Sequence, residues 1–150
     1  MKNLYEAEQV KEVKTRVASL RPESERQWGK MTAAQALAHC SIGLESAIGD
    51  RQIPRVLIGH LLGWLVKPMA LKNDKPFQKN SPTAPELVVS DARDLEREKT
   101  RIIGLIDRFA GAGPAGCTRY PHAFFGELEP QEWAILMYKH LDHHLRQFGV

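Results

Sequence analysis

Cysteine is scarce in this sequence. The 150 residues include two cysteines, Cys40 and Cys117, which lie far apart and form no CxxC pair. This usage predicts buried thiols in a reducing compartment and argues against a disulfide. Residues 1–16 are charged throughout and lack the pattern of a signal peptide. We therefore expect a cytoplasmic protein.

Long apolar runs are missing as well. The most apolar stretch, Val56–Val66, contains His60 and is followed by Lys67, so it is shorter than the roughly 20 residues that a membrane span requires. Acidic and basic residues interleave, as in 91–101, and the net charge is +3. No basic stripe alternates with aromatic residues. These absences predict neither a membrane partner nor a nucleic-acid partner.

The composition that remains is that of one globular domain. Hydrophobic residues make up 43% of the chain and charged residues 26%, which is enough to build a buried core. No segment alternates convincingly like a strand, and no internal repeat is present. We expect a single all-α domain over 1–150.

Two of the expected long helices lie in the first third of the chain. The first covers about residues 3–20, where valines and leucines recur three or four positions apart. The second opens at Thr32, because Thr32 and Gln35 have the spacing of a capping box. It ends near Ile48, where Gly49 stops it.

The other two long helices lie in the second half. One runs from about 90 to 109, and its charged residues, Glu98 among them, are expected mostly in solvent. The other is the C-terminal stretch 133–150, which follows Pro130, a residue favoured in a first helical turn.

A shorter apolar helix and a long loop separate the second and third long helices. Residues 53–71 predict a helix that Gly59 and Gly63 interrupt and Pro68 closes. Residues 72–85 form a polar loop of the length that is often functional or mobile. It contains Pro76, Pro82 and Pro85. The predicted fold is a four-helix bundle with this extra helix.

The last helix places two histidines among its apolar residues. At about 100° per residue, His140 and His144 fall on the apolar side, while Lys139 and Asp142 point away and Ile135 faces solvent. Imidazoles at i and i+4 can bind one metal ion.

A simpler interpretation exists for each histidine. Histidines near the end of a helix interact with its negative pole by roughly 0.3–1 kcal/mol, which fits His143 and His144 but not His140. His39 lies on the second helix beside Ile42, on the side opposite Leu44, and periodicity leaves open which side faces the other helices. A hydrogen-bonded core histidine is the alternative to a ligand there.

The sequence resembles the DinB-like superfamily of four-helix bundles, which includes metalloenzymes and thiol-dependent transferases, and more narrowly an uncharacterised branch of it. The resemblance extends over nearly the whole chain. It rests on WGKMT at 28–32 followed by Gln35 and His39, on HAFFG at 122–126, on Glu132-Trp133, and on HLDHHLRQF at 140–148. It implies that His39, His140 and His144 together bind a divalent metal.

Three neutral imidazoles suit zinc or nickel, with iron or copper as alternatives, and they leave a coordination position open as catalytic sites do. Ligand histidines usually donate their other N–H to a nearby acceptor. Gln35, Ser46 and Gln147 are candidates for this role, and capping or polar packing explains them equally well. His122 is the candidate acid or base, against the alternative of a hydrogen-bonded loop histidine.

These residues support more than one function. The first is a metal-dependent transferase or hydrolase of a small molecule, in which the resemblance suggests a low-molecular-weight thiol. The others are a non-catalytic metal- or ligand-binding stress-response bundle and a structural bundle without metal. An outward Ile135 and the apolar segment 53–71 indicate a possible partner surface. A homodimer and a monomer are equally good expectations.

Overall fold

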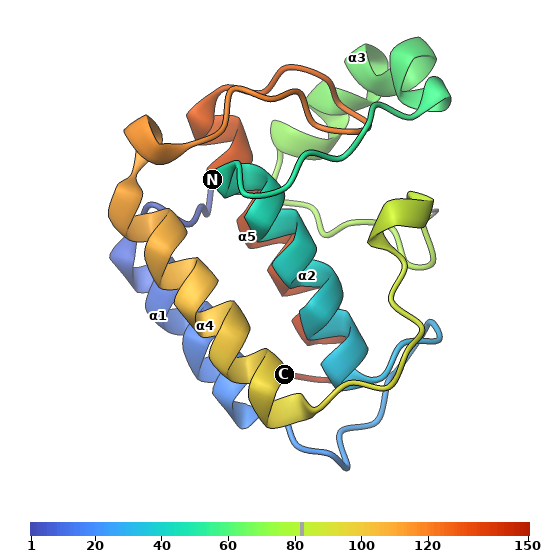
Figure 1. The fold of residues 1–150 in the computed structure, drawn as a ribbon, viewed down its shortest axis with the longest axis vertical. Coiled ribbons are helices and arrows are strands. Elements are labelled where there is room, and N and C mark those ends of the chain that lie inside the picture. Colours follow the sequence, from blue (N-terminus) through green and yellow to red (C-terminus); the bar gives the residue numbers. More distant parts are fainter. Residues whose placement is uncertain (82) are drawn as a thin grey trace.

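The computed structural model describes residues 1–81 and 83–150, so Pro82 of the predicted loop lies outside the described residues. The described part holds five α-helices, two short 3-10 helices and no β-strand, which confirms the all-α class. Four long helices lie side by side, and a fifth projects at one end (Figure 1). The long helices are α1 (Ala7–Ser19), α2 (Ala33–Ile48), α4 (Leu95–Ala112) and α5 (Pro130–Gln147), and the projecting one is α3 (Leu57–Leu71).

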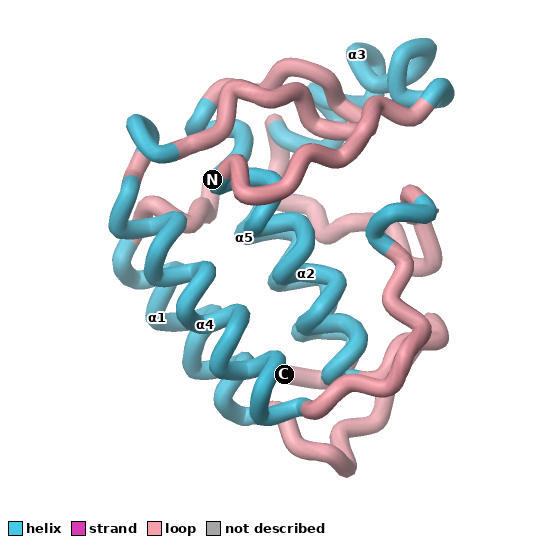
Figure 2. The backbone as a smooth tube through the Cα atoms, in the orientation of Figure 1, coloured by secondary structure: helices cyan, strands magenta, loops and turns pink. Residues whose placement is uncertain are grey.

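Each long helix packs against two others. α1 contacts α4 and α5, and α2 contacts the same two helices. The segment between α3 and α4 runs along the outside of α2, as Figure 2 shows, and includes the 3-10 helix η1 (Pro85–Leu87), which touches α2. A second 3-10 helix, η2 (Pro114–Gly116), follows α4.

No helix among the described residues combines the length and the apolar character needed to cross a membrane.

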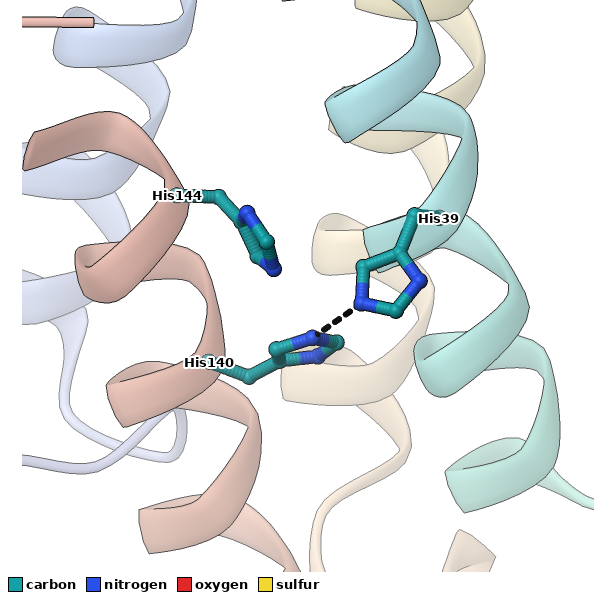
Figure 3. Close-up of side chains that lie close together, drawn as sticks. All are labelled: His39, His140 and His144. Atoms are coloured by element: carbon teal, nitrogen blue, oxygen red, sulfur yellow. Dashed lines mark hydrogen bonds between the residues drawn. The ribbon is translucent and has the colours of Figure 1, made fainter. Parts of the chain in front are cut away.

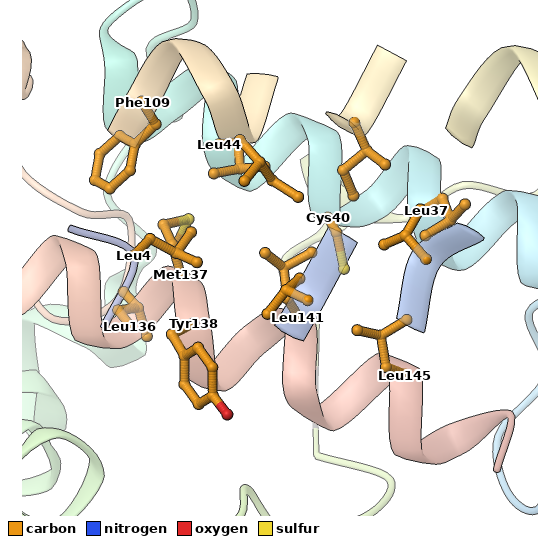
Figure 4. Packing of buried hydrophobic residues seen from close by; sticks show 14 of the residues in the cluster. Leu4, Leu37, Cys40, Leu44, Phe109, Leu136, Met137, Tyr138, Leu141 and Leu145 are labelled. Carbon is orange, nitrogen blue, oxygen red and sulfur yellow. The ribbon is translucent and has the colours of Figure 1, made fainter. Parts of the chain in front are cut away.

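The core fills the space between the four long helices, as the packed side chains in Figure 4 show. Its largest fully buried side chains are Trp133, Phe109, Leu4, Leu20, Leu44, Ile102, Ile106, Leu141 and Leu145. α4 contributes Ile102, Ile106 and Phe109 to this core, and all three are buried. Burial of this kind supplies roughly 1.5–3 kcal/mol for each large apolar side chain.

The start of α1 is later than predicted. The helix begins at Ala7 rather than near residue 3. Before it, the Leu4 N–H donates to the Ala134 carbonyl, and the Asn3 side chain accepts from the Tyr5 N–H. These bonds hold the first residues against α5 in a non-helical form.

The predicted ends of α2 are confirmed. Thr32 and Gln35 form the capping box, in which each side chain accepts from the other residue's backbone N–H. Gly49 ends the helix in the left-handed conformation, with φ of 96°. α2 is buried on nearly every side, which explains why its apolar residues show no single stripe.

The prediction for α3 was wrong in two respects. The helix is continuous through Gly59, Gly63 and Pro68, and it begins at Leu57 rather than near residue 53. Its end at Leu71 agrees with the predicted range. Both glycines lie against the backbone of Phe124, so that a Cβ at Gly59 would come within 2.6 Å of the Phe124 carbonyl oxygen. The glycines therefore permit close packing and do not interrupt the helix.

In α4 both the start and the burial of one residue differ from the prediction. The helix begins at Leu95, because the Asp94 carboxylate caps it by accepting from the Arg97 N–H at 2.8 Å. Glu98 was expected in solvent but is 6% exposed. Its carboxylate accepts from Arg93 and Arg101, and these charge-assisted bonds offset the loss of water.

In α5, Pro130 occupies the first turn, as predicted. Lys139 was expected to point away but is buried, because its ammonium group donates to the carbonyls of Ala70 and Asn73 at the end of α3. Asp142 is buried too, where it accepts from Arg16 and Arg146.

Ile135 also corrects the prediction, since it is 9% exposed and belongs to the core cluster. Ile135 therefore gives no support to a homodimer. The apolar segment of α3 is the one feature that still supports that prediction.

Candidate metal centre

Three histidines from two helices meet between α2 and α5. His39 comes from α2, and His140 and His144 come from α5, one turn apart (Figure 3). One ring nitrogen of each lies within 4.8 Å of the others. The ring centroids are 4.7 to 5.0 Å apart, and the rings stand steeply to one another. The three imidazoles point at a common centre and can hold a metal ion there.

A glycine on α2 makes room for the three imidazoles. Gly43 lies one turn after His39, and a Cβ at Gly43 would be 3.3 Å from Nδ1 of His140 and 3.6 Å from the Met137 sulfur. The first of these separations is tighter than ordinary van der Waals contact. A glycine at this position lets the His140 ring lie close against α2.

His39 is oriented by a backbone carbonyl. Its Nδ1 lies 2.7 Å from the carbonyl oxygen of Leu87, in the 3-10 helix η1. A carbonyl only accepts, so Nδ1 carries the proton and Nε2 presents its lone pair to the centre. A carbonyl or carboxylate behind a histidine is the usual way in which proteins fix the tautomer of a ligand.

His144 is oriented through Gln147. Nδ1 of His144 lies 2.9 Å from Oε1 of Gln147, so His144 also has a protonated Nδ1 and a free Nε2. The amide nitrogen of Gln147 donates to the carbonyl of Trp28 at 2.7 Å. A Cβ at Gly29 would lie 2.5 Å from that same nitrogen. The WGKMT segment thus holds Gln147, which in turn holds His144.

His140 closes the triangle. Its Nε2 lies 2.7 Å from Nε2 of His39, which is a hydrogen-bond distance. Because the His39 proton is on Nδ1, the shared proton is on His140 in the metal-free chain. His140 is partly exposed, whereas His39 and His144 are buried.

The electrostatics keep all three rings neutral. Burial lowers the pKa of His39, and it lowers the pKa of His144 to about 3, with a further contribution from His39. Burial also lowers the pKa of His140, and the neighbouring imidazoles add to the effect. Neutral imidazole is the form that binds a metal, so the donor set fits a metal ion.

The other predicted partners lie elsewhere. Gln35 serves the capping box, and its amide nitrogen donates to the Asp91 carbonyl. Ser46 is buried, and its carbonyl accepts from Gly49. Among the described contacts, neither side chain is hydrogen-bonded to an imidazole of the centre, and Gln147 is the one candidate that is.

His122 has a clear role within its own loop. Its Nδ1 accepts from the N–H groups of Phe124 and Phe125, both at 3.1 Å. The ring packs on Phe125 and Trp133. Burial, with the nearby Arg55 guanidinium, lowers its pKa to about 4. Only Nε2 remains for proton transfer, so a role as acid or base stays a prediction.

Aromatic and basic residues flank the centre on the side of His143. The His143 ring lies 5.0 Å from the His144 ring, 5.6 Å from Trp28 and 6.3 Å from Phe77, measured between centroids. Lys79 lies 4.4 Å above the Trp28 ring. The 72–85 loop therefore reaches His143 and Trp28, beside the centre, through Phe77 and Lys79. Two described hollows, beside α1 and α4 and beneath α3, are not lined by the three imidazoles.

Apart from Gln147, the groups that orient the imidazoles were not predicted from the sequence. The carbonyls of Leu87 and Trp28 carry no side-chain signal, and nothing in the pattern marks them. Gly43 and Gly29 did leave a signal, because glycine within a helix or beside an aromatic often marks a close approach.

The fold is all-α, and a three-histidine cluster lies between two of its helices. The chain is therefore a helical protein with a candidate metal centre. The chain belongs to the family described as protein of unknown function (DUF1569), whose model matches residues 2–149. No curated protein and no solved structure matches the chain.

Proposed function

We propose that the chain is a metal-dependent enzyme with a DinB-like four-helix-bundle fold, acting on a small molecule. The observation that carries the proposal is the convergence of His39, His140 and His144, with ring nitrogens within 4.8 Å of one another. The reaction class is transfer involving a low-molecular-weight thiol, or hydrolysis. The thiol rests on the resemblance to the DinB-like superfamily alone.

The donor set supports zinc or nickel, with iron or copper as alternatives, because neutral imidazoles bind all four. When bound, such a metal lowers the pKa of a water or thiol at its open position. His39 and His144 are fixed by Leu87 and Gln147, so they hold their nitrogens in place without reorganisation. His140 is the one of the three residues that is not classed as buried, so we place the approach of a substrate on its side of the centre.

The cysteines support a reducing and hence cytoplasmic environment. Cys40 and Cys117 are both free, and Cys40 is fully buried. Cys40 lies outside the three-imidazole cluster and packs as a core residue, and burial raises the pKa of its thiol.

Metal content tests the site. Protein purified without a histidine tag should carry about one divalent metal per chain. The His39→Ala and His144→Ala proteins should lose it. The matched control is His60→Ala, which removes an exposed histidine outside the cluster and should keep the metal. Equal metal in the parent and both cluster variants would show that the ion binds elsewhere.

A non-catalytic metal- or ligand-binding stress-response bundle is the second candidate. It is favoured by the two hollows described above, which lie away from the imidazoles. Enzymes place their metal beside a concave cavity. Metal-loaded protein should be screened with small thiols against electrophiles and with ester and amide substrates. Turnover that His140→Ala removes supports the enzyme, and tight metal binding without any turnover supports the second candidate.

A further inference from the structure

The outward side of α3 is apolar. Seven of the nine large hydrophobic side chains that are exposed among the described residues lie on this one helix. They are Leu57, Ile58, Leu61, Leu62, Trp64, Leu65 and Met69. Trp64 is 73% exposed and Leu61 is 64% exposed, so most of each side chain is in contact with solvent. A patch of this size marks a binding surface.

The arrangement is the reverse of an ordinary surface helix. At about 100° per residue, the exposed side chains cover nearly half of the helix circumference without a charged residue among them. Gly59 and Gly63 form the opposite side and pack on Phe124. Lys67 lies at the border, where it pairs with Glu132. In Figure 1 α3 projects from the end of the molecule, and its apolar side chains are exposed there.

Positive charge is concentrated in the chain segment that contains this helix, in which Arg51 and Lys67 are also paired with Glu45 and Glu132. Residues 51–80 contain six lysines and arginines and a single acid, Asp74, whereas the rest of the chain is net negative. Lys72 and Lys75 closely follow the helix, and Lys75 is exposed. Charge of this sign beside an apolar helix is complementary to an anionic surface.

We propose that α3, with its basic flanks, binds the surface of an anionic lipid bilayer, lying in the plane of the interface. Trp64 suits that position, since tryptophan favours the boundary between headgroups and acyl chains. Its indole N–H donates to the Leu61 carbonyl at 3.1 Å and brings no unsatisfied donor into the lipid. A second copy of the chain would bring one basic segment against another, which charge disfavours. The helix lies on the membrane and does not span it.

Vesicle binding by the full chain tests the proposal. Co-sedimentation should detect binding to vesicles of about three parts phosphatidylcholine to one part phosphatidylglycerol, and much weaker binding to pure phosphatidylcholine. Added salt should weaken the binding. The double substitution Leu61→Gln with Leu65→Gln should reduce partition by about tenfold or more. The matched control is Val88→Gln, an exposed hydrophobic residue outside α3, which should bind like the parent.

Two further readouts separate the outcomes. Vesicles should shift tryptophan emission to shorter wavelength, and Trp64→Phe should abolish the shift. Circular dichroism and thermal melts confirm that the variants fold. Absent binding to the anionic vesicles, or equal binding by parent and double variant, would overturn the proposal. Sedimentation velocity would assign the surface to a second copy, and also overturn it, if the parent is a dimer that the double substitution dissociates while neither binds vesicles.

Discussion

α5 and α3 depart from the ordinary helix pattern in opposite ways. α5 turns polar groups inward, since His144 and Gln147 are buried beside leucines. α3 turns apolar groups outward, with Leu57 79% exposed. In α5 the buried His144 and Gln147 both have partners, whereas the exposed apolar groups of α3 are left uncovered by the chain. Buried polar side chains, as on α5, indicate a site for chemistry. Exposed apolar side chains, as on α3, indicate a binding surface.

The largest effect is expected at Gly43. Gly43→Leu places a bulky side chain where even a Cβ would be 3.3 Å from the His140 ring. The ring must move, so we expect metal affinity to fall at least about a hundredfold and the unfolding free energy to drop by about 1–3 kcal/mol. Metal titration and urea denaturation measure these changes.

The control for Gly43 is Gly104→Leu on α4, where nothing lies within 4 Å of an added Cβ. It should keep the metal and cost no stability, since leucine favours a helix over glycine. If both variants bind metal as the parent does, Gly43 does not make room for a ligand.

Gln147 is expected to matter next. Gln147→Leu removes the acceptor of the His144 N–H and the donor to Trp28. Metal affinity should fall by about 10–100-fold, the usual cost of losing a group that orients a ligand. Gln147→Glu keeps an acceptor for His144 but loses the donor to Trp28, so we expect it to restore part of the affinity.

Gln131→Leu is the matched control, because Gln131 is exposed near the start of the same helix. It should leave the affinity unchanged. Isothermal titration with zinc compares the four proteins, and equal loss in the Gln147→Leu and Gln147→Glu variants would mean that Gln147 does not act as an acceptor for His144.

Acid is expected to destabilise the metal-free protein. In the unfolded chain histidines take up a proton near their ordinary pKa of 6.5, while burial lowers the pKa of His144 to about 3 in the folded chain. Between these values the unfolded state binds more protons, so the unfolding free energy decreases as the pH falls from about 6.5 towards 3. At higher pH this contribution is fully present.

Denaturant titrations of chelator-treated protein across this pH range measure the effect. His144→Leu removes one depressed group and should flatten the dependence, whereas His60→Leu should not. An unfolding free energy that is constant over the range in the parent would contradict buried neutral imidazoles.

The smallest effects belong to the surface of α3. Leu61→Gln with Leu65→Gln should change the unfolding free energy by no more than about 0.5 kcal/mol per site, because both side chains are exposed. Gly63→Ala on the opposite side should cost about 1–3 kcal/mol, since its Cβ would overlap the Phe124 carbonyl. Chemical denaturation tests both, and a large loss in the glutamine variant would show that the exposed side is packed.

Local signals predicted much of the fold. The capping box at Thr32, the stop at Gly49 and the first-turn Pro130 are set by residues a few positions apart, so the sequence identifies them. Gly63 was wrongly predicted to interrupt α3. The close packing that requires a glycine there involves Phe124, which is far away in the sequence. Glu98 was misread for a similar reason, since a helical wheel does not show that its arginine partners fold over it.

The candidate site divides in the same way. The spacing of His140 and His144 is local and was visible in the sequence. The prediction that His39 faces the other helices depended on the family resemblance. Periodicity could not give it, because α2 is buried on nearly every side. The carbonyl of Leu87 that orients His39 belongs to a backbone turn, and no side chain marks it.

The most direct test of the central claim is a crystal of the metal-loaded, untagged protein, measured at the absorption edge of the bound metal. We predict one anomalous peak, bonded to Nε2 of His39, His140 and His144. A peak at another position, or no peak in protein shown to contain metal, would contradict the account.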